Sequence, residues 1–350
     1  MKTITVHLTR PYDIHIEKGI LSRAGEYIQN TLGHGRVMVV TDDTVRALYG
    51  DALLSSLHAA GLDTVEFVIP HGEASKNTTS LIDLLNALAE NAFTRTDIVC
   101  ALGGGVVGDL AGFAAAVYLR GIRYVGIPTT LLASVDSSVG GKTAVDLPSG
   151  KNLAGAFHHP SLVLCDPDTL HTLPADVLAD GFAEVIKYAV IGDGELFAML
   201  GASDAPDMEA VIARCVSQKA RIVEEDETDH GVRKHLNFGH TAGHAIELRS
   251  HFGLMHGHGV AIGMMIATEY AIRQGICPAA ALPALADLLT KYHLPTKTEY
   301  AVEELYEAAT RDKKREGAEI DVVLPTGIGS CMLKRIPVVE LHTFLQGGIL

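Results

Sequence analysis

The stretch Ile98-Val-Cys-Ala-Leu-Gly-Gly-Gly-Val-Val-Gly-Asp109 decides the class of fold that we predict for this chain. Its first five residues form a short apolar run, which predicts a buried strand. Residues 103–108 match GxGxxG between that strand and a predicted helix. Glycine lets the backbone approach a pyrophosphate at a helix N-terminus, so the stretch indicates nucleotide binding. An ordinary tight turn is the alternative, because no acidic residue follows about 20 residues later, as the usual fingerprint requires.

The neighbouring segments extend this pattern along the first half of the chain. Short β-branched runs recur at 36–41, 65–69, 98–102, 124–127 and 162–165, and helical spacing of apolar residues appears at 45–60 and 80–91. Such alternation predicts a parallel sheet with helices on both faces. From about Leu173 the patterns become long helices, at 175–190, 208–225, 239–248 and 259–274, with one apolar run at 321–324. We therefore predict an α/β fold, with a Rossmann-like parallel-sheet domain at 1–172 and a mainly helical domain at 173–350.

Composition narrows the range of partners. The 350 residues carry a formal net charge of −14, which opposes binding to nucleic acid. Any anionic ligand must then be attracted by a local group of basic residues. Five widely spaced cysteines without a CxxC pair are typical of the reducing cytoplasm. We expect no membrane association, because the N-terminus has no apolar signal core and the most apolar stretch, 111–118, is too short to span a bilayer.

A second glycine-rich stretch, Val139-Gly-Gly-Lys-Thr143, resembles the end of a P-loop. Asp136 stands where that motif requires its first glycine, which disfavours ATP hydrolysis. Lys142, Lys151 and Asn152 are expected in glycine-rich loops, where two cations and an amide suit phosphate or carboxylate recognition. Solvated loop lysines are the alternative.

Histidines are concentrated near one predicted helix. His240 and His244 are four residues apart and share a helix face, and His256 and His258 follow a loop. Glu184, in an earlier helix, offers an oxygen, and a His2Glu set with open positions is typical of catalytic zinc. A single HxxxH pair is more often structural, so the ligand set stays open at this point.

Charged residues are also placed in apolar helical surroundings. Glu184 and Lys187 lie three residues apart among Phe182, Val185 and Ile186, which predicts a half-buried pair with a function rather than a surface ion pair. Lys219, Arg233 and Asn237 supply the basic group that the acidic total requires.

Together these segments resemble the 3-dehydroquinate synthase family, from about Val39 to Gly329. The strings that carry the resemblance are HGEASK at 71–76, GGGVVGD at 103–109, LRGIRYVGIPTTLLASVDSSVGGKTAVD at 119–146, GKNLAGAF at 150–157, GFAEVIKYAVI at 181–191, LNFGHTAGHAIE at 236–247, HGHGVAIGM at 256–264 and DKK at 312–314.

The resemblance implies roles for individual residues. The expected ligands of Zn²⁺ or Co²⁺ are Glu184, His240 and His256, which leaves His244 facing substrate. The expected NAD+ contacts are Glu73, Lys76, Gly104, Gly105, Val106, Val107, Gly108, Asp109, Thr129, Thr130, Lys142, Lys151, Thr169, Leu170, His171 and Thr172. The expected substrate residues are Arg120, Asp136, Lys142, Asn152, Lys187, Lys219, Arg233, Asn237, His244, Lys313 and Lys314, of which Arg120 reaches the neighbouring subunit of a homodimer.

The resemblance also implies an activity, that of a phosphorus-oxygen lyase of the shikimate pathway acting in a cleft between the two domains. A phosphorylated sugar acid, 3-deoxy-arabino-heptulosonate 7-phosphate, would be oxidised transiently by NAD+, lose phosphate, be re-reduced, open, and close by an intramolecular aldol step to 3-dehydroquinate. The alternatives are a sibling sugar-phosphate cyclase whose substrate has no carboxylate, and a metal-dependent polyol dehydrogenase. One departure is His258, because the family usually has HGE where this chain has His256-Gly257-His258. We expect its imidazole to alter the surroundings of the metal ligands or to compete for the metal.

Overall fold

The computed structural model describes residues 1–251, 253–310 and 318–347. The chain forms two compact units, one of Met1–Leu173 with Met208–Thr228 and one of Pro174–Asp207 with Asp229–Leu350. The first transition lies close to the expected boundary at 172/173. The helix α8 (Met208–Glu225), expected in the second domain, belongs to the first unit because it packs against β1 (Lys2–Val6) and the short helical turn η5 (Ala133–Ser137).

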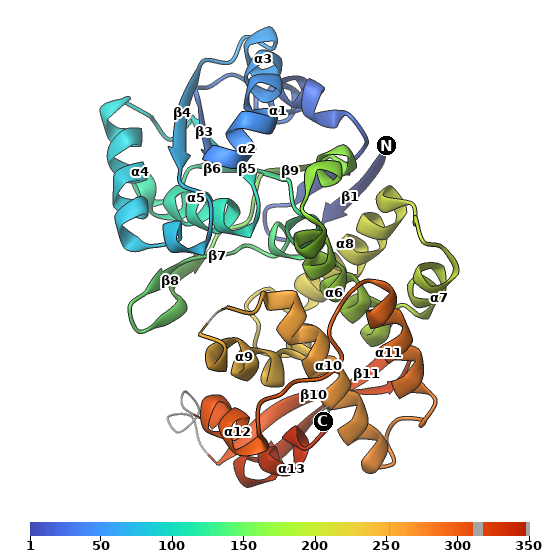
Figure 1. Cartoon of the computed structure of the whole chain (residues 1–350). Coiled ribbons are helices and arrows are strands. Elements are labelled where there is room, and N and C mark those ends of the chain that lie inside the picture. Colours follow the sequence, from blue (N-terminus) through green and yellow to red (C-terminus); the bar gives the residue numbers. More distant parts are fainter. Residues whose placement is uncertain (252, 311–317, 348–350) are drawn as a thin grey trace. The chain divides into compact units, whose positions relative to one another are not determined.

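The first unit is built on a seven-stranded sheet (Figure 1). Its spatial order is β1, β2 (Tyr12–Ile16), β9 (Leu162–Cys165), β6 (Arg123–Pro128), β5 (Ile98–Gly103), β3 (Val37–Asp42) and β4 (Thr64–Ile69). Only the pairing of β1 with β2 is antiparallel, and each later neighbour is parallel. The predicted parallel sheet is confirmed, and β1 and β2 are additions that the sequence analysis did not predict.

Helices cover both faces of this sheet. Cores of buried side chains lie on either side, one with α4 (Thr78–Glu90) and α5 (Gly105–Val117), the other with α1 (Ala24–Leu32) and α3 (Asp51–Ala59). Strand β3 divides its side chains between them, with Met38 and Val40 in the first core and Val37 and Val39 in the second. This alternation follows from the two-residue period of a strand. Burying each such side chain stabilises the fold by roughly 1.5–3 kcal/mol.

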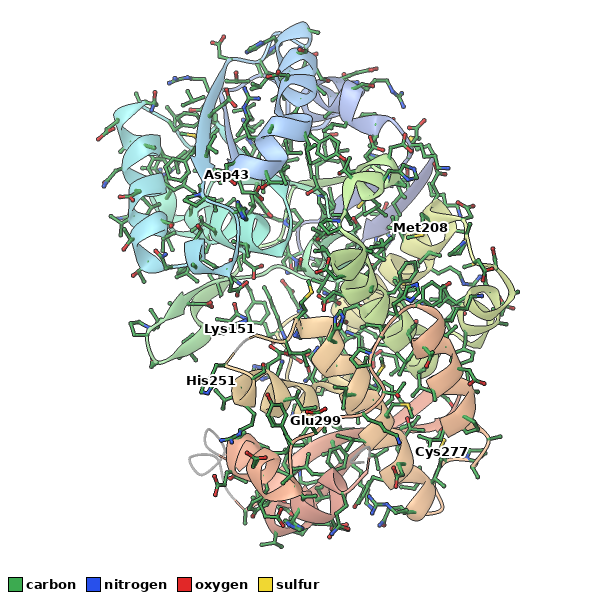
Figure 2. The ribbon with its side chains drawn as sticks, in the orientation of Figure 1. Asp43, Lys151, Met208, His251, Cys277 and Glu299 are labelled. Carbon is green, nitrogen blue, oxygen red and sulfur yellow. The ribbon has the colours of Figure 1, made fainter. Side chains whose placement is uncertain are left out.

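A separate hairpin replaces the glycine-rich loops that we expected. Lys142 begins β7 (Lys142–Leu147), and Lys151 and Asn152 lie on its antiparallel partner β8 (Gly150–Phe157). Figure 2 shows Lys151 on this hairpin. A Cβ at Gly155 would lie 2.3 Å from the Thr143 carbonyl oxygen, so glycine is required for the two strands to pair. The prediction of glycine-rich loops is therefore wrong. Glycine in this segment instead permits two strands to pair closely.

The second unit is mainly helical, as predicted. Its helices are α6 (Ala175–Gly192), α7 (Gly194–Ala202), α9 (His240–Arg249), α10 (His256–Arg273), α11 (Ala281–Lys291), α12 (Val302–Thr310) and α13 (Leu341–Leu345), with a hairpin of β10 (Glu319–Gly327) and β11 (Ser330–Pro337). Helix α10 starts three residues earlier than expected and so includes His256 and His258. Among the described residues, no helix is long and apolar enough to cross a membrane.

Candidate functional site

The predicted cofactor residues of the first unit meet at one edge of its sheet. Glu73 and Lys76 follow β4, residues 104–109 follow β5, and Thr129 and Thr130 follow β6. These strands are parallel, so their carboxyl ends lie at the same edge, where ligands bind in open α/β sheets. The Thr129 N–H donates to the Gly103 carbonyl at 3.0 Å and joins two of these loops.

The glycine turn packs closely against Thr130 at the start of α5. Gly104 precedes the helix and offers no side chain as a cap. A Cβ at Gly104 would lie 3.1 Å from Thr130 Cγ2, so a larger residue would crowd the turn. The Thr129 hydroxyl is buried and makes no hydrogen bond to the part of the chain that the structure describes. A buried polar atom without a partner suits an edge that binds a polar molecule.

Lys76 organises the same edge electrostatically. Its Nζ lies 2.6 Å from Asp109 Oδ2 and 2.6 Å from Asn152 Oδ1, although the lysine is buried. Burial alone would lower the pKa of Lys76, but the attraction of Asp109 outweighs it and the pKa is raised. Burial raises the pKa of Asp109, and Lys76 opposes that change. The pair links α5 to the β7–β8 hairpin.

Two other predicted groups lie in the first unit. The turn η6 (Pro167–Thr172) contains the four predicted cofactor residues 169–172, and the Tyr49 hydroxyl lies 3.0 Å from the Thr169 carbonyl and 2.6 Å from Thr172 Oγ1. Lys219, on α8, donates to the Asp136 carbonyl at 2.6 Å and lies 3.0 Å from its Oδ1. Lys151 Nζ lies 3.8 Å from Glu73 Oε1.

An acid missing from the sequence pattern is present in the fold. Strand β5 lies beside β3, which ends at Asp42 and is followed by Asp43. The chain adds β4 on one side of β3 and β5 on the other, so the strand order reverses between β3 and β5. An acid at the end of the strand next to a glycine turn suits ribose hydroxyls. His71 donates to Asp43 Oδ1 through its backbone N–H at 3.1 Å, and its Nδ1 lies 2.8 Å away; this bonding lowers the Asp43 pKa. We missed these acids because they precede the glycine turn by about 60 residues, whereas the usual acid follows it.

In the second unit, the predicted metal ligands come together. Glu184 Oε1 lies 3.4 Å from His256 Nε2 and 3.7 Å from His240 Nε2, and one atom of each residue lies within 4.8 Å of the others. His240 Nδ1 donates to the Phe238 carbonyl at 3.1 Å, which turns its Nε2 toward Glu184. Oxygen and nitrogen atoms at this spacing fit a small divalent cation.

The pKa values at this cluster have opposite shifts. Burial lowers the pKa of His240 to about 3, so this ring is neutral and its Nε2 carries a lone pair. Burial also lowers that of His256, but hydrogen bonds to Glu184 and Glu247 outweigh it and raise the pKa to about 10. Glu184 and Glu247 therefore favour a positive charge on His256.

Three further residues surround the cluster. Lys187 forms an ion pair with Glu184, and both side chains are 1% exposed, so the pair is buried more deeply than predicted. His244 is exposed, with its ring centre 5.3 Å from that of His240. Glu247 Oε1 accepts from His256 Nδ1 at 2.9 Å. Glu247 was missed in the sequence analysis, although it follows His240 by seven residues and so shares its helix face.

The remaining predicted substrate residues of the second unit are only partly described. Arg233 is buried and Asn237 is exposed in the turn η7 (Val232–Asn237). The next residue, Lys234, forms an ion pair with Asp321 on β10 at 2.8 Å, and Arg335 donates to the same carboxylate at 2.9 Å. Lys313 and Lys314 lie outside the described residues. Lys219 and Arg233, which we expected in one basic group, belong to different units.

Comparison with known proteins assigns the chain to a family. The 3-dehydroquinate synthase N-terminal family matches residues 66–180, and the 3-dehydroquinate synthase C-terminal family matches 181–315. A 3-dehydroquinate synthase from Enterococcus faecalis is 43% identical over 358 aligned positions, covering 100% of both chains. One from Clostridium acetobutylicum is 44% identical and covers 99% of each.

Solved structures agree with the fold. A 2-epi-5-epi-valiolone synthase from Streptomyces hygroscopicus subsp. jinggangensis, with NAD+ and Zn²⁺ bound, superposes with a TM-score of 0.86 at 30% identity and 96% coverage of each chain. A 2-deoxy-scyllo-inosose synthase gives a TM-score of 0.88 at 24% identity, covering 99% of this chain and 100% of that one. With the family matches over both halves and relatives of full length, the chain belongs to the 3-dehydroquinate synthase family.

Proposed function

We propose that this chain converts 3-deoxy-arabino-heptulosonate 7-phosphate into 3-dehydroquinate and phosphate, with NAD+ and a divalent metal as cofactors. The observation that carries the proposal is the group of Glu184, His240, His256 and Lys187, of which Glu184 and Lys187 are buried, in a chain that aligns over 100% of the Enterococcus faecalis relative. A charge pair with both side chains 1% exposed costs free energy to bury, so we expect it to serve the reaction.

The residues present fit both cofactors. The Gly104–Asp109 turn, Thr129 and Lys76 would hold NAD+, and Asp43 would accept from a ribose hydroxyl. Glu184, His240 and His256 would hold zinc or cobalt. When bound, the metal would act as a Lewis acid toward a substrate hydroxyl, and NAD+ would accept and return the hydrogen of the same carbon.

The side chains of this chain would bind and orient the substrate. Lys142 and Asn152, on the β7–β8 hairpin, suit the phosphate, because a lysine cation and an amide both donate to its oxygens. Arg233 suits the carboxylate, which it can bind through two parallel N–H groups. His244 is exposed beside His240 and can accept a proton from a substrate hydroxyl, while Lys187 keeps a positive charge next to Glu184. Holding one conformer of the open chain favours the aldol closure by orientation.

A homodimer is part of this proposal. Leu119, Arg120 and Gly121 all have positive φ, at 48°, 71° and 116°, so the turn η4 (Tyr118–Arg120) and the glycine after it hold an unusual backbone conformation. Arg120 is exposed at this turn. A cation presented in this way is suited to the phosphate of a substrate in a second copy. We also expect a cytoplasmic location, which the five free cysteines favour.

The test measures inorganic phosphate released from the sugar acid, with NAD+ and zinc each added or withheld. Release that needs both, without accumulation of NADH, is the expected result. Glu184→Gln should abolish it, and Glu90→Gln, at an exposed position of α4, is the matched control. No release from a protein with bound zinc would refute the proposal.

A second candidate is the sibling cyclase that uses a substrate without carboxylate. The 30% identity to the valiolone synthase over 96% of the chain favours it, whereas buried Arg233 favours the carboxylate. Faster turnover of sedoheptulose 7-phosphate than of the sugar acid would select this candidate. In that case Arg233→Met should leave the preferred turnover unchanged.

A further inference from the structure

The first turn of α10 has no capping side chain of its own. Its N-cap residue, Met255, makes no side-chain hydrogen bond to the helix. The first N–H groups of a helix have no partner within it. Asp180, on α6, supplies one, because its Oδ1 accepts from the His258 N–H at 3.1 Å. A residue of α6 therefore caps α10.

The same oxygen also holds the side chain of His258. His258 Nδ1 lies 3.2 Å from Asp180 Oδ1, with both side chains largely buried. A neutral imidazole with its hydrogen on Nδ1 donates as an imidazolium does, so the contact needs no particular charge on the ring. One carboxylate oxygen thus joins the main chain and the side chain of His258.

The two helices are in close backbone contact at this junction. A Cβ on Gly257 would lie 2.1 Å from the Asp180 carbonyl oxygen, so only glycine fits. Gly257 follows His256 directly, and Asp180 precedes Glu184 by about one helical turn. The junction therefore sets the distance between Glu184 and His256, whose Oε1 and Nε2 atoms lie 3.4 Å apart.

The departure of this chain from HGE has a local explanation. A glutamate at the third position of a helix is favourable, because its carboxylate interacts with the free N–H groups and the positive end of the dipole. Here the carboxylate already comes from Asp180. A glutamate at 258 would add a second buried carboxylate beside it, and the two would repel each other.

We propose that Asp180 and His258 act together as positioning residues for Glu184 and His256, and that His258 stands in place of the family's usual glutamate because Asp180 supplies the carboxylate. The identity of what Glu184 and His256 hold rests on the proposed function. The contact between the two helices does not depend on it.

The test measures zinc affinity by competition with a chelator, and the absorption spectrum of the cobalt-loaded protein. His258→Glu should raise the zinc Kd by roughly 10- to 100-fold and alter the cobalt spectrum. Asp180→Asn with His258→Glu should recover most of the affinity, because the Asn amide donates to the Glu carboxylate. His258→Asn should stay near wild type, since its Nδ2 occupies the place of His Nδ1. His34→Glu, the same change at an exposed position, is the control.

The outcomes separate this proposal from the proposed function. Zinc binding by His258→Glu as tight as wild type, or a double variant no better than the single one, would overturn the pairing. If wild type binds no zinc, the proposed function fails, and urea unfolding of the metal-free variants then tests whether Asp180 and His258 act together. Changes in unfolding free energy that are not additive support their joint action, and additive changes overturn it. If His258→Glu does not fold, folding of the double variant supports the pairing, and failure of both overturns it.

Discussion

Replacement of Lys76 by methionine should destabilise the first unit, and more so at high pH than at low pH. The Lys76 side chain is 6% exposed, and its Nζ lies 2.6 Å from Asp109 Oδ2. Methionine keeps an unbranched apolar side chain but removes the charge. Asp109, whose side chain is 18% exposed, would then lose its ion-pair partner.

The expected loss of unfolding free energy is large. Removal of one partner of a buried ion pair costs about 3–5 kcal/mol, whereas replacement of both partners by neutral groups is often neutral. The double variant Lys76→Met with Asp109→Asn should therefore be close to wild type in stability. Lys18→Met, at an exposed position, should change the free energy of unfolding by less than about 0.5 kcal/mol.

The pH dependence has a definite sign. Burial raises the pKa of Asp109 above its ordinary value of 3.8, and without Lys76 it should rise further. A group whose pKa is raised on folding stabilises the native state below its unfolded pKa and loses that contribution as pH rises through the folded pKa. The free energy of unfolding that Lys76→Met loses relative to wild type is therefore greatest at alkaline pH, and this loss shrinks as pH falls toward 3.8.

Hydrogen exchange of the α4 and α5 amides is the suitable assay, because the chain has no tryptophan and these helices report on the first unit alone. A loss of 3 kcal/mol speeds exchange through unfolding by about 100-fold. Variant and wild type are compared at the same pH, at about 5 and about 8. The reasoning would be refuted if the ratio of the variant's exchange rate to that of wild type were the same at both pH values. It would also be refuted by a double variant as unstable as Lys76→Met.

Three further predictions concern other parts of the chain. Glu247→Gln should raise the zinc Kd by roughly 10- to 100-fold, because Glu247 orients His256; an unchanged Kd in a chelator competition would contradict this. Ion pairs lower the pKa of Asp321 to about 2, so Asp321→Asn should cost about 1–2 kcal/mol of unfolding free energy near neutral pH, after allowance for solvent screening. That cost should vanish as pH falls through about 2 in acid titrations followed by circular dichroism, and a pH-independent cost would count against the ion pairs. Arg120→Met should reduce phosphate release without a change in thermal stability, and equal activity of variant and wild type would exclude Arg120 from the site.

Strands and helices with local patterns were predictable from the sequence. The predicted strands 98–102 and 162–165 match β5 and β9 to within one residue, because a buried parallel strand is apolar at each position. The β7–β8 hairpin was not predictable in this way. It depends on pairing between Lys142 and Phe157, and on an Asp146 N–H bond to the Lys76 carbonyl, which no local pattern encodes.

The candidate site shows the same limit at the level of side chains. Two helices of the site show the same spacing. Asp180, Glu184 and Lys187 lie at i, i+4 and i+7 on α6, and His240, His244 and Glu247 repeat it on α9. That spacing could have identified Asp180 and Glu247 as members of the same helix faces. It could not indicate that Asp180 caps another helix, because this depends on the close approach at Gly257. The roles of the site residues stay predictions until they are measured.

We expect buried cations to let this acidic chain bind an anion. The net charge of −14 opposes a phosphorylated acid at long range. Lys76, Lys187, Lys219 and Arg233 are all buried, so they contribute little to the outer field. Close to a ligand they act in surroundings of low polarity, where a charge–charge interaction is several times stronger than in water. Lys76, Lys187 and Lys219 each have a carboxylate partner in the same unit, which keeps the buried cations stable before an anion arrives. We therefore expect each unit to contribute to anion binding through its own buried cations, while the surface stays acidic.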